Sequence, residues 1–360
     1  FNAQKYPEKS LNQTWDLFLE SDDYTESRED NYPYEALLPS KTSPEFPYDF
    51  SKINDSIETF DLFGYTPFSN SILLDLAKSG ISAEHLGQDE HADFLNVSIS
   101  ATDIIGHAFG PFSKEIHDTY VRLDRDLAAF FEYLDKNVGK NEYLVFLTAD
   151  HAVEPIPQYL IEHKLTANYF GMDELKEVVA QSIKQNLEGQ LRTEMKDSTE
   201  YSFIKAIRNQ QVYLNFEALN ALEVDVDLTL KEIKSNLEKM KGVKYIFSKE
   251  DLMSNNHRYI NNLVGKGVHP KESGDLIVLL EPGYLSVGTN DHAHKKGTSH
   301  GSPYGYDTDV PLLWYGWETP VKQVFREINI TDITATLKRV LNVQKPNACT
   351  GETIVELFNK

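Results

Sequence analysis

Apolar residues recur at helical spacing in one long stretch of the chain, with a short apolar run on either side. From about Ser113 to Asn137 they return every three or four residues, which predicts an amphipathic helix. The flanking runs, FLNVSIS (94–100) and EYLVFLTAD (142–150), have the length and composition of strands. The second run is almost continuously apolar, as in strands of parallel sheets. Strand, helix and strand together predict a βαβ unit.

Three further segments complete this pattern. TPFSNSILLDLAKSG (66–80) predicts a helix, with Thr66 as its N-cap and a proline at the first helical position. DVPLLWYG (309–316) is expected to be another core strand. ITDITATLKRVL (330–341) predicts an amphipathic helix capped by Thr331.

The middle of the chain has a different order of predicted helices and strands. Between about 155 and 290 we expect two helices, DELKEVVAQSIKQNL and LTLKEIKSNLEKM, and strands in QVYLN, VKYIFS and DLIVLLEPGYL. We therefore predict an α/β core built from residues 1–155 and 291–360, with a mostly parallel sheet and helices on both faces. Residues 156–290 form a small α+β insertion in this interpretation.

Charge narrows the range of partners. The 360 residues include 56 acidic and 35 basic side chains, a formal net charge of −21. Such a chain repels duplex nucleic acid and anionic membranes, and we predict neither as a partner. Any phosphate group must be attracted by a local positive centre, for which a metal ion is the natural candidate. The single cysteine, Cys349, rules out an intrachain disulfide and a CxxC zinc motif.

Two Asp/His pairs follow the predicted strands. Asp103 and His107 come just after the first strand, and Asp150 and His151 end the second. Because sites in α/β sheets form outside the carboxyl ends of strands, we expect the two pairs at one sheet edge. The spacing alone is weak evidence. Asp150 as a cap of the next turn and His151 as an ordinary buried histidine remain open alternatives.

A histidine-rich loop, DHAHKKGTSHGSPYGYDTDVP (291–311), precedes a further predicted strand and contains His292, His294 and His300. Carboxylate oxygen with imidazole nitrogen is the ligand set of zinc, and less often of manganese, iron or cobalt. Asp103 and His107 with His300 would give three protein ligands and an open fourth position, which is the form of a catalytic zinc site.

Several ordered motifs resemble one enzyme superfamily. TDIIGHAFGP, LTADHA, GTSHGSPYGYDTDVPLLWYG and ITDITATL are similar to the alkaline phosphatase superfamily. The resemblance is strongest to its type I phosphodiesterase/nucleotide pyrophosphatase branch, and within that branch to the bacterial phosphate-irrepressible alkaline phosphatases. It covers most of the chain and implies an alkaline phosphatase-like core.

The resemblance also implies a cofactor set. Members of the family hold two zinc ions side by side at the C-terminal edge of the central sheet. One ion would be held by Asp103, His107 and His300. Asp150 and His151 would hold part of the other. The match at GTSHG selects His300 over the other two histidines of its loop, His292 and His294, which we expect to have no direct ligand role.

Two departures from the family pattern stand out. The glycine that usually follows the Asp-His pair is Ala152 here. The family's nucleophilic Thr or Ser comes from an N-terminal βα unit, and nothing in residues 1–102 resembles that unit. Thr66 is the nearest imitation, but its place before a helix explains it as a cap. We therefore expect no catalytic nucleophile in this chain, a nucleophile upstream of Phe1, and a C-terminal fragment of a longer protein.

By resemblance, the complete enzyme is a zinc-dependent phosphomonoesterase that acts on small-molecule phosphate esters. It would work by two-metal, in-line phosphoryl transfer. One alternative is a nucleotide pyrophosphatase or phosphodiesterase, and another is a metal-binding fragment without activity. The resemblance also implies export to the periplasm or the cell surface.

Overall fold

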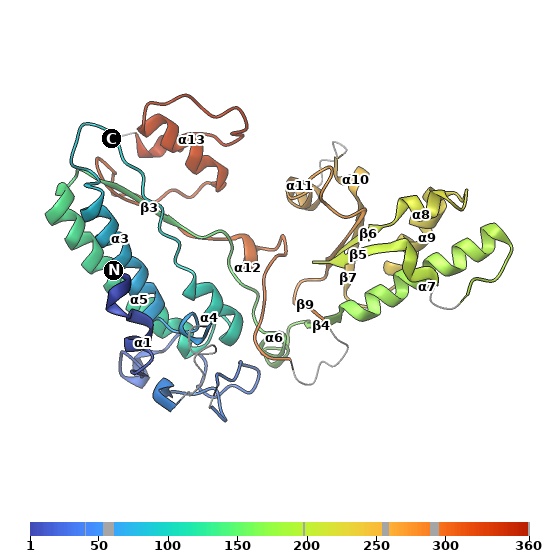
Figure 1. Cartoon of the computed structure of the whole chain (residues 1–360), viewed down its shortest axis with the longest axis horizontal. Helices are drawn as coiled ribbons and strands as arrows, with labels where there is room; N and C mark the ends of the chain where they lie inside the picture. Colours follow the sequence, from blue (N-terminus) through green and yellow to red (C-terminus); the bar gives the residue numbers. More distant parts are fainter. Residues whose placement is uncertain (40, 53–60, 197–198, 254–258, 289–294, 359–360) are drawn as a thin grey trace. The chain divides into compact units, whose positions relative to one another are not determined.

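The computed structural model describes residues 1–39, 41–52, 61–196, 199–253, 259–288 and 295–358 (Figure 1). The chain forms two compact units, one from residues 1–152 and 309–360 and the other from residues 153–308. The first boundary lies close to the predicted one at 155/156. The second lies at 308/309 rather than at 290/291.

In its described residues, the first unit contains four helices of nine residues or more, the strand pairs β1/β2 and β3/β10, and several short helices. Its main elements are α3 (Phe68–Ala83), α4 (Ala101–Phe109), α5 (Lys114–Leu134), β3 (Leu144–Thr148), β10 (Leu312–Gly316) and α13 (Thr331–Val340). The short ones are η1 (Asn2–Gln4), α1 (Tyr6–Ser10), β1 (Thr14–Trp15), η2 (Ser21–Asp23), β2 (Tyr48–Asp49), η3 (Phe50–Lys52), η4 (Asp135–Gly139) and η6 (Val355–Leu357).

Helix α5 confirms the predicted long helix. It begins where the Ser113 side chain accepts a hydrogen bond from the Ile116 N–H, at 3.2 Å, and it continues into the wider turn η4. Leu123 and Leu134 are buried against α3, as the spacing predicts. Tyr120 is 55% exposed, although the same spacing places it on the apolar face.

The two predicted caps are wrong. Pro67, not Thr66, occupies the N-cap of α3, because the buried Thr66 hydroxyl instead donates to the Phe63 carbonyl at 2.8 Å. Ile330 occupies the N-cap of α13, where the Asp332 carboxylate accepts the N–H of Asn329 at 3.0 Å. Neither helix has a side-chain cap hydrogen bond, so neither threonine acts as a cap.

The sheet of the first unit differs from the prediction. β3 pairs with β10 in antiparallel register, with Leu312 opposite Thr148. Residues 94–100 pair with no strand in the described part of the chain, and Phe94 is 61% exposed. The parallel βαβ unit is therefore absent among the described strands of this unit, because a strand needs a neighbour for its backbone groups. β3 is half-buried throughout rather than buried on both faces. The α/β class itself is confirmed.

The Asp118 carboxylate attaches several segments of the irregular N-terminal region to α5. Asp118 is fully buried, and its oxygens accept hydrogen bonds from four donors within 2.7 Å. The donors are the Trp15 indole, the Phe18 main chain, the Tyr24 hydroxyl and the Arg122 guanidinium. A buried carboxylate is tolerated when its lone pairs are all used in this way.

Two further carboxyl groups are buried in the first unit. Glu35 and Glu115 are each 1% exposed. Glu35 forms an ion pair with Arg28, and Glu115 accepts a hydrogen bond from the Tyr48 hydroxyl at 2.5 Å. Burial raises the pKa of both carboxyl groups above its ordinary value, and Arg28 opposes the rise.

The second unit is α+β, as predicted. An antiparallel sheet has the order β5 (Ile204–Arg208), β6 (Gln211–Leu214), β8 (Leu276–Leu280) and β7 (Val243–Ser248). A parallel pair joins β4 (Asn168–Gly171) to β9 (Tyr284–Val287). Helices α7 (Met172–Leu191) and α9 (Val226–Leu237) pack into the same core as the four-stranded sheet. The remaining elements are α6 (Pro157–Glu162), η5 (Thr199–Phe203), α8 (Phe216–Asn220), α10 (Lys249–Met253), α11 (Tyr259–Lys266) and α12 (Gly305–Thr308).

Each predicted segment of the insertion forms the expected type of element. DLIVLLEPGYL forms two strands instead of one, β8 and β9, separated by a turn at 281–283. A search of the described helices for one long and apolar enough to span a bilayer gave none.

Replacing Asp118 tests its role as an attachment point. We expect Asp118→Ala to lower the free energy of unfolding by about 3–5 kcal/mol, because it leaves buried donors and the Arg122 charge without their acceptor. Urea denaturation measures this change. Asp124→Ala, an exposed position on the same helix, is the matched control and should change stability by less than about 0.5 kcal/mol. Equal effects of the two substitutions would contradict the role of Asp118.

The buried carboxyl pair predicts a dependence of stability on pH. A carboxyl group with a raised pKa in the folded state stabilises the fold below its unfolded pKa, and this stabilisation is lost as pH rises through the folded pKa. Glu115→Gln keeps an acceptor for Tyr48 and removes the buried charge. We expect it to be more stable than the wild type by ~1–3 kcal/mol near pH 8.5, with a much smaller difference near pH 5.

Urea denaturation at the two pH values measures this difference. The exposed Glu26→Gln is the control and should follow the wild type at both. If Glu115→Gln raises the free energy of unfolding by the same amount at both pH values, the ionisation of Glu115 is not coupled to folding.

Candidate metal centre

Helix α4 carries the first two candidate ligands on one face. Asp103 and His107 lie one turn apart, and the His107 Nε2 atom is 3.5 Å from the Asp103 Oδ1 atom. The opposite face holds Ile105 and Phe109, which are fully buried. The helix is therefore anchored by its apolar side while the two polar groups face away from that core.

The C-terminal end of α4 is sharply defined. Gly110 follows the last helical residue with a φ of 78°, a left-handed backbone conformation that favours glycine. The Arg28 guanidinium donates to the Phe109 carbonyl at 2.5 Å and so satisfies one of the terminal acceptors. Arg28, which also forms an ion pair with the buried Glu35, thus fixes the C-terminal end of α4.

The second Asp/His pair follows β3 directly and approaches the first. The His151 Nε2 atom lies 4.0 Å from the Asp103 Oδ1 atom and 3.7 Å from the Asp150 Oδ2 atom. Four of the five candidate ligands therefore meet within the first unit, and Asp103 is the neighbour that both histidines share. The predicted meeting of the two pairs is present, although the strand expected before Asp103 is not.

A hydrogen bond determines which nitrogen of His151 carries the proton. The His151 Nδ1 atom lies 2.9 Å from the Ala152 carbonyl. A carbonyl can only accept, so Nδ1 must donate, and the lone pair of a neutral ring is on Nε2. Nε2 is the atom directed toward Asp103 and Asp150. The ring thus has the tautomer that a metal ligand needs.

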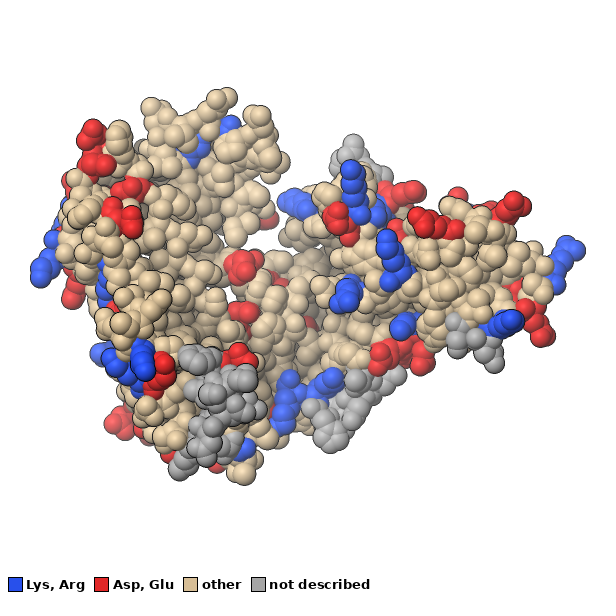
Figure 2. Space-filling view, in the orientation of Figure 1, with Lys and Arg blue, Asp and Glu red and all other residues tan. Residues whose placement is uncertain are grey.

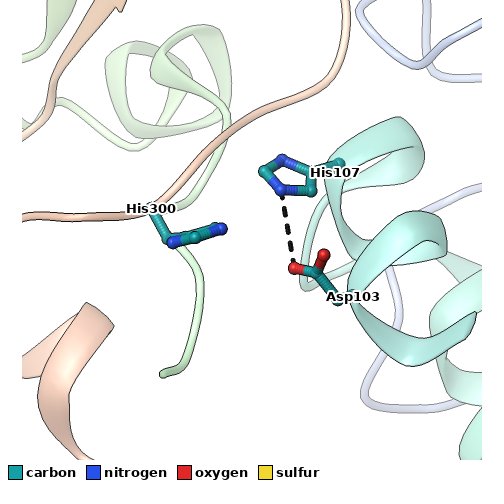
Figure 3. A group of neighbouring side chains, drawn as sticks. All are labelled: Asp103, His107 and His300. Carbon is teal, nitrogen blue, oxygen red and sulfur yellow. Dashed lines mark ion pairs between the residues drawn. The ribbon is translucent and has the colours of Figure 1, made fainter. Parts of the chain in front are cut away.

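The third candidate ligand, His300, belongs to the second unit and lies in the loop before α12. One potential ligand atom from each of Asp103, His107 and His300 lies within 4.8 Å of the others. Figure 3 shows Asp103 and His107 projecting from the same side of α4, with the ion pair between them dashed, and His300 on its loop. These are the three residues that the sequence analysis grouped around one ion.

The donor set and its spacing fit a divalent cation. Ligand atoms about 2.0–2.1 Å from a tetrahedral ion lie about 3.3 Å apart, and the His107–Asp103 distance of 3.5 Å is close to this value. One carboxylate with two imidazoles suits zinc or a similar transition metal better than magnesium or calcium. The side chains of Asp103, His107 and His151 are 44%, 35% and 26% exposed, so solvent and a small ligand can reach them.

The remaining residues named in the sequence analysis are Asp150, Ala152, His292 and His294. Asp150 is 89% exposed, and its Oδ1 atom accepts the N–H of His151 at 3.2 Å. Ala152 is not among the described residues with positive φ, so its methyl group is accommodated without strain. His292 and His294 lie outside the described residues.

The sequence analysis missed two buried acids beside the His300 loop. Glu154 and Asp307 are 4% and 3% exposed. Burial raises the pKa of Glu154 to about 7, and the charge of Asp307 adds to the rise. Neither residue belongs to a spacing pattern for metal ligands, and only their burial in the folded chain distinguishes them from the many exposed acids.

Comparison with known proteins places this geometry in a family. The model of the family described as type I phosphodiesterase / nucleotide pyrophosphatase matches residues 12–303. Alkaline phosphatase PafA from Elizabethkingia meningoseptica is 35% identical over all of this chain and 63% of its own length. Alkaline phosphatase PhoV from Synechococcus elongatus is 33% identical over 99% of this chain and 61% of its own length.

A solved structure agrees with these matches. The crystal structure of wild-type PafA aligns with 99% of this chain and 65% of its own, with a TM-score of 0.88 and 35% identity. The chain thus spans less than two thirds of the length of these relatives. The two relatives are named alkaline phosphatases, and the family is one of hydrolases. With its motifs, its fold and its Asp/His cluster in agreement, the chain belongs to the type I phosphodiesterase / nucleotide pyrophosphatase family.

Proposed function

We propose that this chain is the metal-binding core of a zinc-dependent phosphoric ester hydrolase of the alkaline phosphatase type. The observation that carries the proposal is the meeting of two Asp/His pairs within the first unit, where Asp103 lies beside both His107 and His151. Segments distant in sequence contribute these side chains. Membership of a hydrolase family also supports the proposed activity. The substrates in this proposal are small-molecule phosphate esters.

Each of the two ions has its own ligands in the proposal. Asp103, His107 and His300 hold one ion, and Asp150 and His151 hold part of the second. When bound, two such ions supply Lewis acidity at both ends of an in-line phosphoryl transfer. The i,i+4 spacing on α4 sets the separation of Asp103 and His107, and the Nδ1 hydrogen bond directs His151.

The charge distribution is compatible with a local positive centre. On the face shown in Figure 2, lysine and arginine side chains lie singly or in small groups among acidic ones. The net charge of −21 repels anionic substrates at long range. Bound divalent cations would therefore be the principal attraction for a phosphate ester.

The nucleophile is not assigned to these residues. Thr66, the nearest sequence match, is fully buried, and its hydroxyl donates to the Phe63 carbonyl. It has no access to a substrate. We infer that the nucleophilic Thr or Ser lies outside the 360 residues, so that this chain by itself binds metal without turning over substrate. On the family resemblance, we also infer that the protein acts in the periplasm or at the cell surface.

A second candidate function is nucleotide pyrophosphatase or phosphodiesterase. The description of the matching family model favours it. The names of the two relatives favour the phosphomonoesterase instead.

Zinc binding tests the ligand assignment. We expect isothermal titration of the metal-free chain to give two zinc ions per chain. His300→Ala should weaken one of them by more than about tenfold, because it leaves that ion with two protein ligands. His91→Ala removes a histidine that is 81% exposed and should leave both affinities unchanged. Unaltered stoichiometry and affinity in His300→Ala would mean that the wrong histidine has been assigned.

Turnover tests the inference about the nucleophile. The 360-residue chain with added zinc should hydrolyse neither p-nitrophenyl phosphate nor bis(p-nitrophenyl) phosphate above the rate of zinc in buffer. Rapid hydrolysis would show that the chain contains its own nucleophile. In that event, the ratio of the two rates would distinguish the monoesterase from the phosphodiesterase.

A further inference from the structure

The His300 segment is held on both sides by buried groups of the second unit. Before His300, the Thr298 hydroxyl donates to the Glu154 carbonyl at 2.7 Å, and the Glu154 N–H donates to the Ser299 carbonyl at 3.1 Å. After it, the Asp307 Oδ2 atom accepts hydrogen bonds from two consecutive main-chain N–H groups. The two residues before His300 and the two residues after it are thus all held by hydrogen bonds.

Asp307 makes the more specific of these attachments. Its Oδ2 atom lies 3.1 Å from the Gly301 nitrogen and 2.7 Å from the Ser302 nitrogen. Two successive N–H groups can converge on one oxygen only in a tightly curved backbone, and Gly301 has a φ of 117°, which favours glycine. The carboxylate is 3% exposed, so these hydrogen bonds form away from competing water.

A buried carboxylate lowers the stability of the fold unless hydrogen bonds or a nearby positive charge compensate for its lost hydration. Its second oxygen, Oδ1, is buried and accepts no hydrogen bond from the described residues. The negative charge of Asp307 also adds to the raised pKa of the neighbouring Glu154. Asp307 therefore occupies a site where an uncharged residue would be expected on stability alone.

We propose that Asp307 is a positioning residue for His300, which sets the direction of the imidazole by fixing the two residues that follow it. This inference rests on the proposed function, in which His300 is a metal ligand. A metal site loses affinity steeply when a ligand is free to turn, because ordering that ligand then costs part of the binding free energy.

Titration of the metal-free 360-residue chain with Co²⁺ tests the proposal, with the visible absorption of the bound ion as readout. Asp307→Ala should weaken the site that His300→Ala also weakens, by about 10- to 100-fold. Asp307→Asn keeps one oxygen acceptor without the charge and should give a smaller loss. Asp309→Ala, an exposed position two residues further on, is the matched control and should leave Co²⁺ binding unchanged.

A double-mutant cycle separates positioning from a purely structural role. If Asp307 acts through His300, Asp307→Ala has no further effect on Co²⁺ affinity in a His300→Ala background. Equal losses in both backgrounds would overturn the proposal. So would unchanged affinity in folded Asp307→Ala, with thermal unfolding of the metal-free chain as the folding check. If Asp307→Ala does not fold, Asp307→Asn takes its place in the cycle.

The same experiment distinguishes this inference from the proposed function. If His300→Ala itself binds Co²⁺ as tightly as the wild type, the ligand assignment fails and the inference fails with it. If His300→Ala weakens binding but the Asp307 variants do not, only the positioning role is overturned.

Discussion

The hydrogen bonds accepted by the buried Asp118 carboxylate hold the first unit together. The N-terminal region has little regular structure, so its own backbone groups cannot fix it in place. The Trp15 indole, the Phe18 main chain and the Tyr24 hydroxyl all donate to this one side chain of α5. Asp332 does the same on a smaller scale, because it accepts the main-chain N–H groups of the segments before α13 and near residue 352. In this strongly acidic chain, a few carboxylates thus act as internal attachment points for irregular segments.

The candidate metal centre depends on the region that Asp118 organises. Trp15 packs into the core cluster that also contains Ile105 and Phe109 of α4. The opposite side of α4 carries Asp103 and His107. The position of the two ligands is therefore set by burial beneath them, and the chain need not place them through a regular parallel sheet.

The sequence predicts local elements better than their pairing. The long helix α5, the strand β3 and the alternation within the second unit all follow from apolar spacing. Residues 94–100 have the composition of a strand, but strand formation requires a neighbour, which composition does not encode. The predicted caps at Thr66 and Thr331 are wrong because each helix begins without a side-chain cap, and a short motif does not encode the exact first residue of a helix.

The candidate ligands can be named from the sequence more readily than the pairing of the strands, although their role as ligands stays a prediction. Asp103 and His107 are recognisable from the motif TDIIGHAFGP, because their spacing alone is weak evidence for a metal site. His300 required the family motif, since two other histidines lie in the same loop. Asp307 could not be found in this way. Only its burial and its two main-chain donors set it apart, and both are properties of the folded chain.

The two faces of α4 have an evolutionary consequence. The same nine residues supply both packing against the interior and two of the candidate metal ligands. A change in the side-chain volume beneath Ile105 would move the helix, and with it the position of Asp103 and His107 relative to Asp150 and His151. Under the proposed function, selection for metal affinity also restrains the apolar residues under this helix, so their rate of change across relatives should be as slow as that of the ligands themselves.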